Sequence, residues 1–270
     1  MKLTIIGLGG LGGAIANGVL AAGGDVGDVG GIDLVVCGRR QGSVDAFAGR
    51  ARLELDARAA ARGADVVLLA VKPKGTVDLL RHIADVVEPG AVVVSCAAVV
   101  TLGRLVADLG VVRFGVARAM PNIGAQRRVS TTGYVLGASC DPARDHPRLE
   151  AVFGAIGVVR ELHDEGLLHA VTAVAASGPA FLLLAVEALV DAGVEQGLSR
   201  ADAVVCARGA LIAAAARLDG DLEPLMVRAQ VTSPGGTTAA GLAALEDAGV
   251  RGAFQQAVRA AVDRSKALGG

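Results

Sequence analysis

The sequence predicts an α/β protein in which a doubly wound, mostly parallel β-sheet is followed by an all-helical domain. Short apolar runs of strand length alternate with helical stretches up to about residue 163. After Asp164 the strand signals stop, and the chain becomes rich in Ala and Leu with short breaks at glycine and proline. We therefore expect two domains, one over residues 1–163 and one over residues 164–270.

The composition argues against several classes of protein. The 270 residues are 53% hydrophobic but only 2% aromatic, so the core must consist mainly of Ala, Val and Leu. The formal net charge is -1 and no basic run occurs, which argues against nucleic acid as a partner. No CxxC or metal-ligand spacing occurs, so we expect no metal and buried, reduced thiols of a cytoplasmic protein. The four cysteines are Cys37, Cys96, Cys140 and Cys206.

One apolar run, residues 167–186, is long enough to raise the question of a membrane span. His169 lies near its start, Pro179 lies inside it, and Glu187 follows at once. We therefore expect a helix buried between subunits and no membrane association. The first residues run directly into a strand and a glycine turn, so we expect no signal peptide.

A glycine-rich turn follows the first expected strand, residues 2–6, and a helix of small residues starts near Ala14. This order of strand, GxGxxG turn and helix is the setting of the dinucleotide-binding fingerprint. Its glycines permit the tight turn, the approach of a pyrophosphate and close packing of helix on strand. The sequence therefore predicts a Rossmann-like NAD(P)-binding domain. The turn consists of Gly7, Leu8, Gly9, Gly10, Leu11 and Gly12.

Two arginines follow the next expected strand, residues 32–37, which ends in Gly38, Arg39 and Arg40. A site selective for NAD usually carries an acidic residue here, which binds the ribose hydroxyls. Guanidinium groups instead pair with phosphate through two N–H donors. We therefore expect NADP, with NADPH preferred and NAD as the alternative cofactor. The competing interpretation is two solvated loop arginines.

The later strands predict where a ligand binds, because ligands of parallel sheets gather at the carboxyl ends of the strands. Lys72 and Pro73 follow one strand, Cys96 and Ala97 follow the next, and the segment 118–122 follows a third. We expect these segments to face the ligand. The strands are expected at 64–71, 91–95, 111–117, 131–136 and 158–162, with helices near 76–87, 101–109 and 142–156.

The stretch VTSPGGTT, residues 231–238, is a second candidate site. Ser233 and Pro234 are typical of a helix start, because the hydroxyl can cap and proline fits the first helical position. The two following glycines would lie in the first turn, each at a cost of about 1 kcal/mol against alanine. A chain tolerates that cost where its backbone approaches a ligand closely. Free amides at a helix start favour a small carboxylate or phosphate, and the alternative is a plain helix cap.

The helical domain is small and would bury little surface alone. Its expected helices are apolar over wide arcs, so we expect a second copy to complete its core. A homodimer follows, with larger rings as the alternative. The apolar positions are Leu182, Val186, Leu189 and Val190 on one helix and Val204, Leu211, Ile212 and Ala215 on the next.

The supply of proton donors constrains the chemistry. Reduction of a carbonyl by a nicotinamide leaves an alkoxide, which needs a donor such as Lys or His. None of the four lysines lies in the first helices of the second domain, where a hydroxyacid dehydrogenase of this plan has its catalytic lysine. A protonated cyclic imine already carries its proton, so that positioning supplies most of the rate. The sequence therefore favours a cyclic imino acid as substrate.

With these residues in place, the chain resembles the pyrroline-5-carboxylate reductase family almost from end to end. The resemblance implies NAD(P)H-dependent reduction of 1-pyrroline-5-carboxylate to L-proline. It also implies a helical domain that interlocks with its dimer mate, often within a decamer, and an active site shared between the cofactor domain and helices of the dimer. The motifs are the glycine turn, AVKPK at 70–74, SCAA at 95–98, RAMPN at 118–122, AVTAVAASGPAF at 170–181, DAGVEQGLSR at 191–200 and, most specifically, VTSPGGTTAAGLAALE at 231–246.

The same resemblance implies a role for each matched residue. Ser233 and Thr238 would be catalytic. The cofactor would be held by residues 7–12 together with Gly38, Arg39, Arg40, Ala70, Val71, Lys72, Pro73, Cys96 and Ala97. The substrate would be held by Met120, Pro121, Asn122, Ser233, Gly236, Thr237 and Thr238.

Several positions depart from the family pattern, and none of them removes a presumed catalytic group. Val99 stands where a glycine usually follows the paired alanines, and Ile123 replaces a threonine. These two can reshape the pocket, so reduction of a related cyclic imine is one alternative function. A non-catalytic NADP-binding sensor is another. The remaining departures are Gly10 and Leu11 for Asn-Met, Ala57 for an asparagine near the adenosine ribose, Gly124 for a proline, and Phe181 for a tyrosine.

Overall fold

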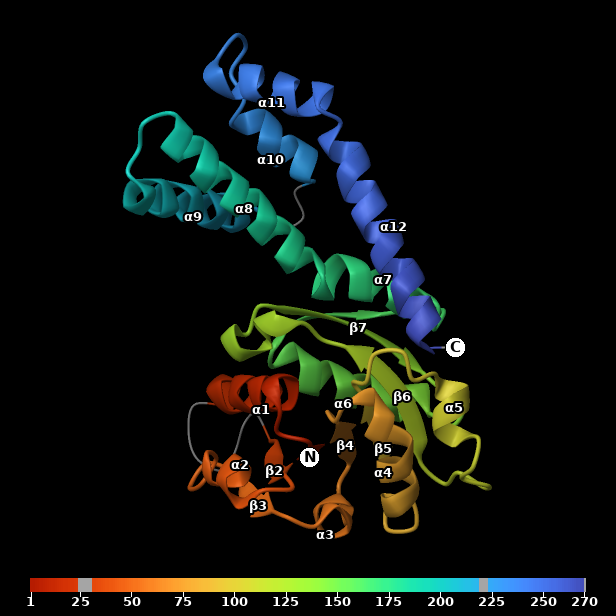
Figure 1. The fold of residues 1–270 in the computed structure, drawn as a ribbon. Helices are drawn as coiled ribbons and strands as arrows, with labels where there is room; N and C mark the ends of the chain where they lie inside the picture. Colours follow the sequence, from red (N-terminus) through yellow and green to blue (C-terminus); the bar gives the residue numbers. More distant parts are fainter. Residues whose placement is uncertain (24–30, 219–222, 270) are drawn as a thin grey trace. The chain divides into compact units, whose positions relative to one another are not determined.

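The computed structural model describes residues 1–23, 31–218 and 223–269 (Figure 1). The chain divides into two compact units. Unit 1 comprises Met1–Ala176 and Ala261–Gly270, and unit 2 comprises Ser177–Ala260. The sequence-based boundary near residue 163 lies two residues after the last strand, which ends at Glu161, whereas the first segment of unit 1 extends to Ala176.

Unit 1 contains an eight-stranded sheet in the order β3-β2-β1-β4-β5-β6-β7-β8. All neighbouring strands pair in parallel except β6 and β7, which are antiparallel. The predicted mostly parallel sheet is thereby confirmed. The strands are β1 (Lys2–Ile6), β2 (Asp33–Cys37), β3 (Arg52–Glu54), β4 (Val66–Leu69), β5 (Val92–Ser95), β6 (Gly115–Met120), β7 (Ser130–Leu136) and β8 (Gly157–Glu161).

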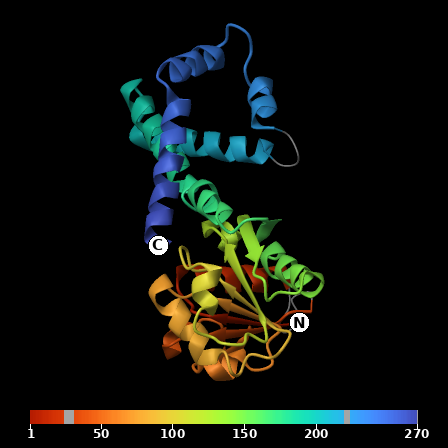
Figure 2. The ribbon, with the colours of Figure 1, turned by 90° about the vertical axis from the view of Figure 1, so that its right-hand side faces the viewer.

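Helices cover both faces of this sheet (Figure 1, Figure 2). The α1 helix supplies Ile15 and Val19 to one core, which also contains Leu3 of β1. The opposite core contains Ile6 of the same strand and Leu80 of α4. Because alternate residues of a strand point to opposite faces, the continuous apolar runs of the sequence become strands buried on both sides. The helices of unit 1 before residue 165 are α1 (Gly10–Gly23), α2 (Gln41–Asp45), α3 (Ala57–Ala61), α4 (Thr76–Ile83), α5 (Leu102–Val106) and α6 (Pro142–Gly154), with 3₁₀ turns η1 (Pro73–Gly75) and η2 (Ile123–Arg127).

Two strands differ from the sequence-based expectation. β3 was not expected, because its three residues form no apolar run. The strand expected over 111–117 is wrong in position, since β6 begins at Gly115 and continues through Arg118 to Met120. An arginine appeared to end the strand in the sequence, but Arg118 is only 5% exposed and lies inside the sheet.

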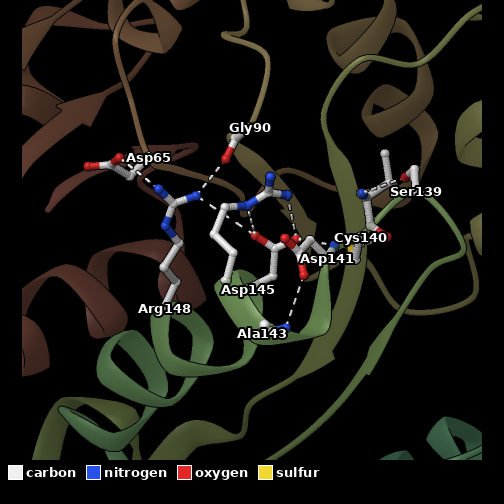
Figure 3. Close-up of polar contacts among 10 residues, drawn as sticks. Asp65, Gly90, Ser139, Cys140, Asp141, Ala143, Asp145 and Arg148 are labelled. Atoms are coloured by element: carbon white, nitrogen blue, oxygen red, sulfur yellow. Dashed lines mark hydrogen bonds and ion pairs between the residues drawn. The ribbon is translucent and has the colours of Figure 1, made fainter.

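A buried carboxylate joins α6 to the strands' amino ends. Asp145 is fully buried and accepts hydrogen bonds from the Arg144 guanidinium at 2.8 and 2.9 Å and from the Asp141 amide at 2.9 Å (Figure 3). Arg148, one turn on, donates to the Gly90 carbonyl at 2.6 Å and to Asp65 at 3.0 Å. This cluster lies at the edge of the sheet opposite to the carboxyl ends of the parallel strands.

Unit 2 is helical and has a small core. Val190 of α8 and Ala203 and Ala207 of α9 are buried together. Many large apolar side chains of the same unit remain exposed in the single chain. They include Leu182, Leu189, Val204 and Ile212, all on the faces predicted to meet a second copy. The helices are α8 (Gly178–Glu195), α9 (Arg200–Arg217), α10 (Pro224–Gln230), α11 (Thr237–Asp247) and α12 (Val250–Gly269), whose last turns belong to unit 1.

The apolar segment singled out in the sequence is helical. It comprises α7 (Leu167–Val171), the π-helical turn η3 (Thr172–Ala176) and α8. Among the described residues, Leu167–Glu195 is the one helical segment with the length and composition of a membrane span, and 11% of its most apolar window is buried. One such segment is weak evidence for a membrane span, because the core helix of a soluble protein passes the same test of length and composition. Absence of membrane association stays a prediction.

Candidate active site

The glycine turn between β1 and α1 has the geometry of a dinucleotide-binding loop. Gly7 adopts φ +104°, and its amide donates to the Cys37 carbonyl at 2.9 Å. A Cβ at Gly12 would lie 1.9 Å from the Gly7 carbonyl oxygen, so only glycine fits where the helix meets the strand. A Cβ at Gly9 or Gly10 would meet nothing within 4 Å. The loop is therefore tight on its inner side and open where a pyrophosphate approaches the helix amides.

The two arginines lie beside this turn, after β2. Gly38 is buried against Ser43 and Leu8, whereas Arg39 and Arg40 are exposed. Within the described part of the chain, neither guanidinium group makes an ion pair or hydrogen bond. Both are therefore free to pair with a phosphate, and the site fits the additional phosphate of NADP.

Two further predicted segments lie at the carboxyl ends of adjacent strands. Ala70 and Val71 follow β4 and contact Gly7, and Lys72 and Pro73 are exposed beyond them. Cys96 follows β5, and its amide donates to the Leu69 carbonyl at 3.0 Å. Burial raises the pKa of the Cys96 thiol to about 12, so this group is neutral and serves as apolar lining.

Val99 has an unusual backbone conformation. Its φ is +68°, in the left-handed region that disfavours a β-branched side chain. The sequence signal was visible, because Val99 stands at the position where a glycine is usual in the resemblance described above. The structure adds the reason for that glycine, namely a turn that requires positive φ directly after the Cys96–Ala97 segment.

Asn122 is already engaged by the fold of unit 1. Its Nδ2 donates to the Ala175 carbonyl at 3.0 Å, and its Oδ1 accepts from the Gly124 amide at 2.9 Å. The carbonyl belongs to the π-helical turn η3, and such turns are frequent at functional sites. Met120 ends β6 and Pro121 is buried, so these residues form a fixed wall at the carboxyl edge of the sheet.

The VTSPGGTT stretch differs from its predicted local structure. Ser233 does not cap a helix and Pro234 does not begin one, because α11 starts at Thr237 with Gly236 as its N-cap. Gly235 adopts φ +68°, which a right-handed helix excludes, and the Gly236 amide donates to the Ser233 carbonyl at 3.1 Å. Pro234 and Gly235 thus form the centre of a β-turn placed before the helix.

The consequence of this shift is a helix start with unused donors. No side chain caps the first turn of α11 within the described residues. Ser233, Thr237 and Thr238 are exposed, and their hydroxyl groups make no hydrogen bond to any described residue. Backbone amides and hydroxyls at one helix N-terminus can bind a carboxylate. The helix thus begins three residues later than Pro234, and an anion site at its start stays a prediction.

One further candidate residue, Glu165, could not be predicted from the sequence. This residue accepts hydrogen bonds from Arg118 and from the Leu102 amide, at the start of α5. Arg118 belongs to the RAMPN motif, but a sequence separation of 47 residues gave no sign of its partner.

The parallel sheet, the glycine turn and the strand-end segments define a class of protein, the NADP-dependent oxidoreductases with a Rossmann-like domain. Residues 2–99 match the family model "NADP oxidoreductase coenzyme F420-dependent". Residues 165–268 match the model "Pyrroline-5-carboxylate reductase dimerisation", which identifies this region as a homo-oligomerisation domain.

The chain belongs to the pyrroline-5-carboxylate reductase family. It is 37% identical to the pyrroline-5-carboxylate reductase of Mycobacterium tuberculosis over 294 aligned positions, which cover 99% of this chain and 96% of that protein. The solved structure of the Coxiella burnetii enzyme has a TM-score of 0.90 at 32% identity and covers 99% of this chain and 98% of its own. The Plasmodium falciparum enzyme, solved with NADP bound, has a TM-score of 0.82 at 25% identity and covers 100% of this chain and 98% of its own.

Proposed function

We infer that this protein is a pyrroline-5-carboxylate reductase that uses NADPH to convert 1-pyrroline-5-carboxylate to L-proline, the last step of proline biosynthesis. The observation that carries this inference is the joint presence of the dinucleotide turn at residues 7–12 and the VTSPGGTT stretch in a chain of this family. Bound NADPH supplies the hydride. NADP is the cofactor that the exposed Arg39 and Arg40 fit.

We propose that the segments at the carboxyl edge of the sheet hold the cofactor. The amides at the start of α1 and the open side of Gly9 suit the pyrophosphate, since no side chain blocks its approach. Arg39 and Arg40 suit the additional phosphate. The neutral Cys96 and the buried Ala97 suit contact with one face of the nicotinamide ring. The other cofactor residues in this proposal are Gly7, Leu8, Gly10, Leu11, Gly12, Gly38, Ala70, Val71, Lys72 and Pro73.

We propose that the start of α11 holds the substrate. Its free amides, together with the Ser233 and Thr237 hydroxyls, suit the carboxylate of the imino acid. The Thr238 hydroxyl suits the ring nitrogen. Hydride adds to the carbon of the protonated C=N bond, the π electrons move to nitrogen, and a neutral secondary amine results. No residue has to donate a proton in that step, so the protein needs to supply only position and orientation.

A related cyclic imine is the second candidate substrate. It is favoured by two exceptional positions, Val99 in its left-handed conformation and Ile123 with 73% of its surface exposed. Both lie on segments that border the proposed nicotinamide site, where a larger side chain can alter the ring that fits. A non-catalytic NADP sensor remains a third candidate, and the uncapped, hydroxyl-lined start of α11 argues against it.

Steady-state assays with purified protein, both nicotinamides and imines of five- and six-membered rings decide among these functions. We expect NADPH consumption with 1-pyrroline-5-carboxylate and the highest kcat/KM for that imine. A higher kcat/KM for a six-membered imine would favour the second candidate. Cofactor binding without consumption by any imine would favour the sensor.

The assembly and location of the protein are also proposals. We propose a homodimer formed by unit 2, whose exposed apolar faces on α8 and α9 suit burial against a second copy, with a decamer as the larger alternative. We propose a cytoplasmic location, supported by four free cysteines. The expectation that all four are buried is wrong for Cys206, which lies exposed on α9, and Cys140 is only partly buried.

A further inference from the structure

The segment between β5 and α5, residues 96–101, is held at its start by strand pairing and at its end by a hydrogen bond to an ion pair. We call it the 96–101 loop. At its start, Ser95 of β5 pairs in register with Arg118 of β6. At its end, the Leu102 amide donates to Glu165 Oε1 at 2.7 Å. Arg118 Nη1 donates to that same oxygen at 2.6 Å, so the ion pair connects the two ends of the loop.

The ion pair is unusually well shielded on its cationic side. The Arg118 side chain is 6% exposed and the Glu165 side chain 28%. Arg118 Nε is buried and has no hydrogen-bond partner, which is the one such side-chain atom among the described residues. Burying an arginine with an unsatisfied donor is costly, and a general stabilising role would be better served by an apolar pair. The contacts of this pair favour a positional role instead, because Glu165 bonds both Arg118 of β6 and the Leu102 amide that follows the loop.

The loop between these two anchors contains the strained Val99. A left-handed valine persists only where the surrounding structure imposes it. The Ala97 amide and the Ser95 hydroxyl are 3.3 Å apart at the loop's start, and the Glu165 bond fixes its end. Loss of the ion pair would let the turn relax and displace Cys96 and Ala97.

We propose that Arg118 and Glu165 are positioning residues for hydride transfer, which hold the 96–101 loop so that Cys96 and Ala97 present a fixed surface to the nicotinamide. This proposal rests on the proposed function, because that function assigns the nicotinamide to this loop. Neither residue touches the reacting atoms in this account. Their effect is on the orientation of the ring, which governs the rate far more than it governs substrate affinity.

The test uses Glu165→Gln, Arg118→Met and the double variant, with Asp85→Asn as the matched control. Glu165→Gln keeps an acceptor for the Leu102 amide but removes the charge, and Arg118→Met removes the cation. The control breaks the exposed Arg58–Asp85 pair of the same unit, which joins α3 to the segment that follows α4. Measurements are kcat, KM for the imine, the NADPH dissociation constant and the melting temperature.

We expect each single variant to lower kcat by roughly tenfold or more while KM for the imine changes less than about threefold. The double variant should lose little beyond the worse single variant, because both act through one interaction. The control should keep the wild-type kcat. A lower melting temperature with unchanged kcat in folded protein would overturn the proposal and leave a purely structural ion pair. Wild-type protein that binds NADPH but reduces no imine would instead refute the proposed function, a different and separately visible result.

Discussion

The last turn of α12 packs directly against the strained turn after β5. A Cβ added to Gly269 would lie 2.8 Å from the Val99 carbonyl oxygen and 3.4 Å from the Val99 Cβ. Val99 therefore holds its left-handed conformation under two constraints. One is the rest of the 96–101 loop to which it belongs, and the other is the end of α12. Position 99 is where the sequence and the backbone disagree most clearly.

This disagreement predicts an inverted preference between alanine and glycine at position 99. Both Val99→Ala and Val99→Gly remove the valine methyl groups, but only glycine accepts φ +68° without steric cost. We expect Val99→Gly to be the more stable variant, with a free energy of unfolding about 1 kcal/mol higher than that of Val99→Ala. Denaturant titration of the two variants measures this difference.

The matched control for this prediction is Glu150, an exposed residue inside α6. There Glu150→Gly should be less stable than Glu150→Ala by about 1 kcal/mol, because glycine disfavours the helix. If alanine were also preferred at position 99, the turn would not have the left-handed backbone described above.

The Asp145 cluster predicts a loss of stability without a loss of cofactor binding. Asp145→Asn leaves the two arginines around a buried site without their carboxylate, which we expect to cost roughly 3 kcal/mol of unfolding free energy. The cluster contacts Asp65 and Gly90 before β4 and β5 (Figure 3), whereas the dinucleotide turn follows the carboxyl end of β1. NADPH titration below the melting temperature should therefore give the wild-type dissociation constant. A large change in that constant would show that the cluster supports the cofactor site.

The environment of His169 predicts that the stability of the protein depends on pH. Burial, with the nearby charges of Arg118 and Lys266, lowers the pKa of His169 below its ordinary 6.5, against the opposing effect of Glu165. The folded state therefore binds a proton less readily than the unfolded state, and stability falls as pH drops below about 6.5. His169 Nδ1 also lies 2.8 Å from the Ser265 hydroxyl. His169→Asn should consequently lose less stability than wild type between about pH 7 and pH 5.

Chemical denaturation across that pH range tests the histidine prediction. His163→Asn, at an exposed histidine of the same unit, serves as the control and should behave as wild type. Parallel stability curves for His169→Asn and wild type would contradict the assigned origin of the pH dependence.

The exposed arginine pair predicts cofactor selectivity. Replacing Arg39 or Arg40 by alanine removes the charge-assisted hydrogen bonds that we propose to the additional phosphate of NADPH. We expect the NADPH dissociation constant to rise by roughly tenfold, while that of NADH changes little. Fluorescence titration with both cofactors measures this, and Arg62→Ala is the control because Arg62 precedes β4 at the opposite edge of the sheet. Equal losses for both cofactors would place the arginines at another part of the nucleotide.

Thr238 predicts an effect on catalysis that is separate from cofactor binding. Thr238→Ala removes a hydroxyl that is free in the single chain and is proposed to bind the ring nitrogen. We expect kcat/KM for the imine to fall roughly tenfold or more, since a hydrogen bond to a charged group is worth about 1.5–3 kcal/mol. The NADPH dissociation constant should stay unchanged. Thr131→Ala, at an exposed threonine of β7, is the control, and wild-type turnover by Thr238→Ala would remove this hydroxyl from the mechanism.

The parts of the fold that local chemistry dictates could be predicted from the sequence. Gly7 and Gly12 leave no choice of residue, because the turn needs positive φ at one and no Cβ at the other. The buried parallel strands follow from their apolar runs. The start of α11 could not be predicted from Ser233 and Pro234 alone, since the positive φ of Gly235 converts an apparent cap into a separate turn.

The long-range partners of the site could not be predicted for a different reason. Nothing near Arg118 in the sequence indicates that Glu165 neutralises it, because the pairing depends on how β6, α5 and the segment before α7 come together. The side chain of Asn122 likewise looked available for substrate, and only the fold shows its bond to the Ala175 carbonyl. The role of a residue can be predicted from sequence when the local backbone conformation requires that residue type, as at Gly7. It is harder to predict when the role depends on tertiary contacts, as at Arg118.

The most direct test of the assigned activity follows a deuterium atom. Wild-type protein is incubated with 1-pyrroline-5-carboxylate and NADPH that carries deuterium at the transferable position of the nicotinamide, and the product is analysed by mass spectrometry and NMR. Hydride transfer to the protonated imine predicts L-proline with one deuterium. The deuterium lies on the former C=N carbon, which is the neighbour of the ring nitrogen that does not carry the carboxylate. Absence of labelled proline, while the protein still binds NADPH, would contradict the account.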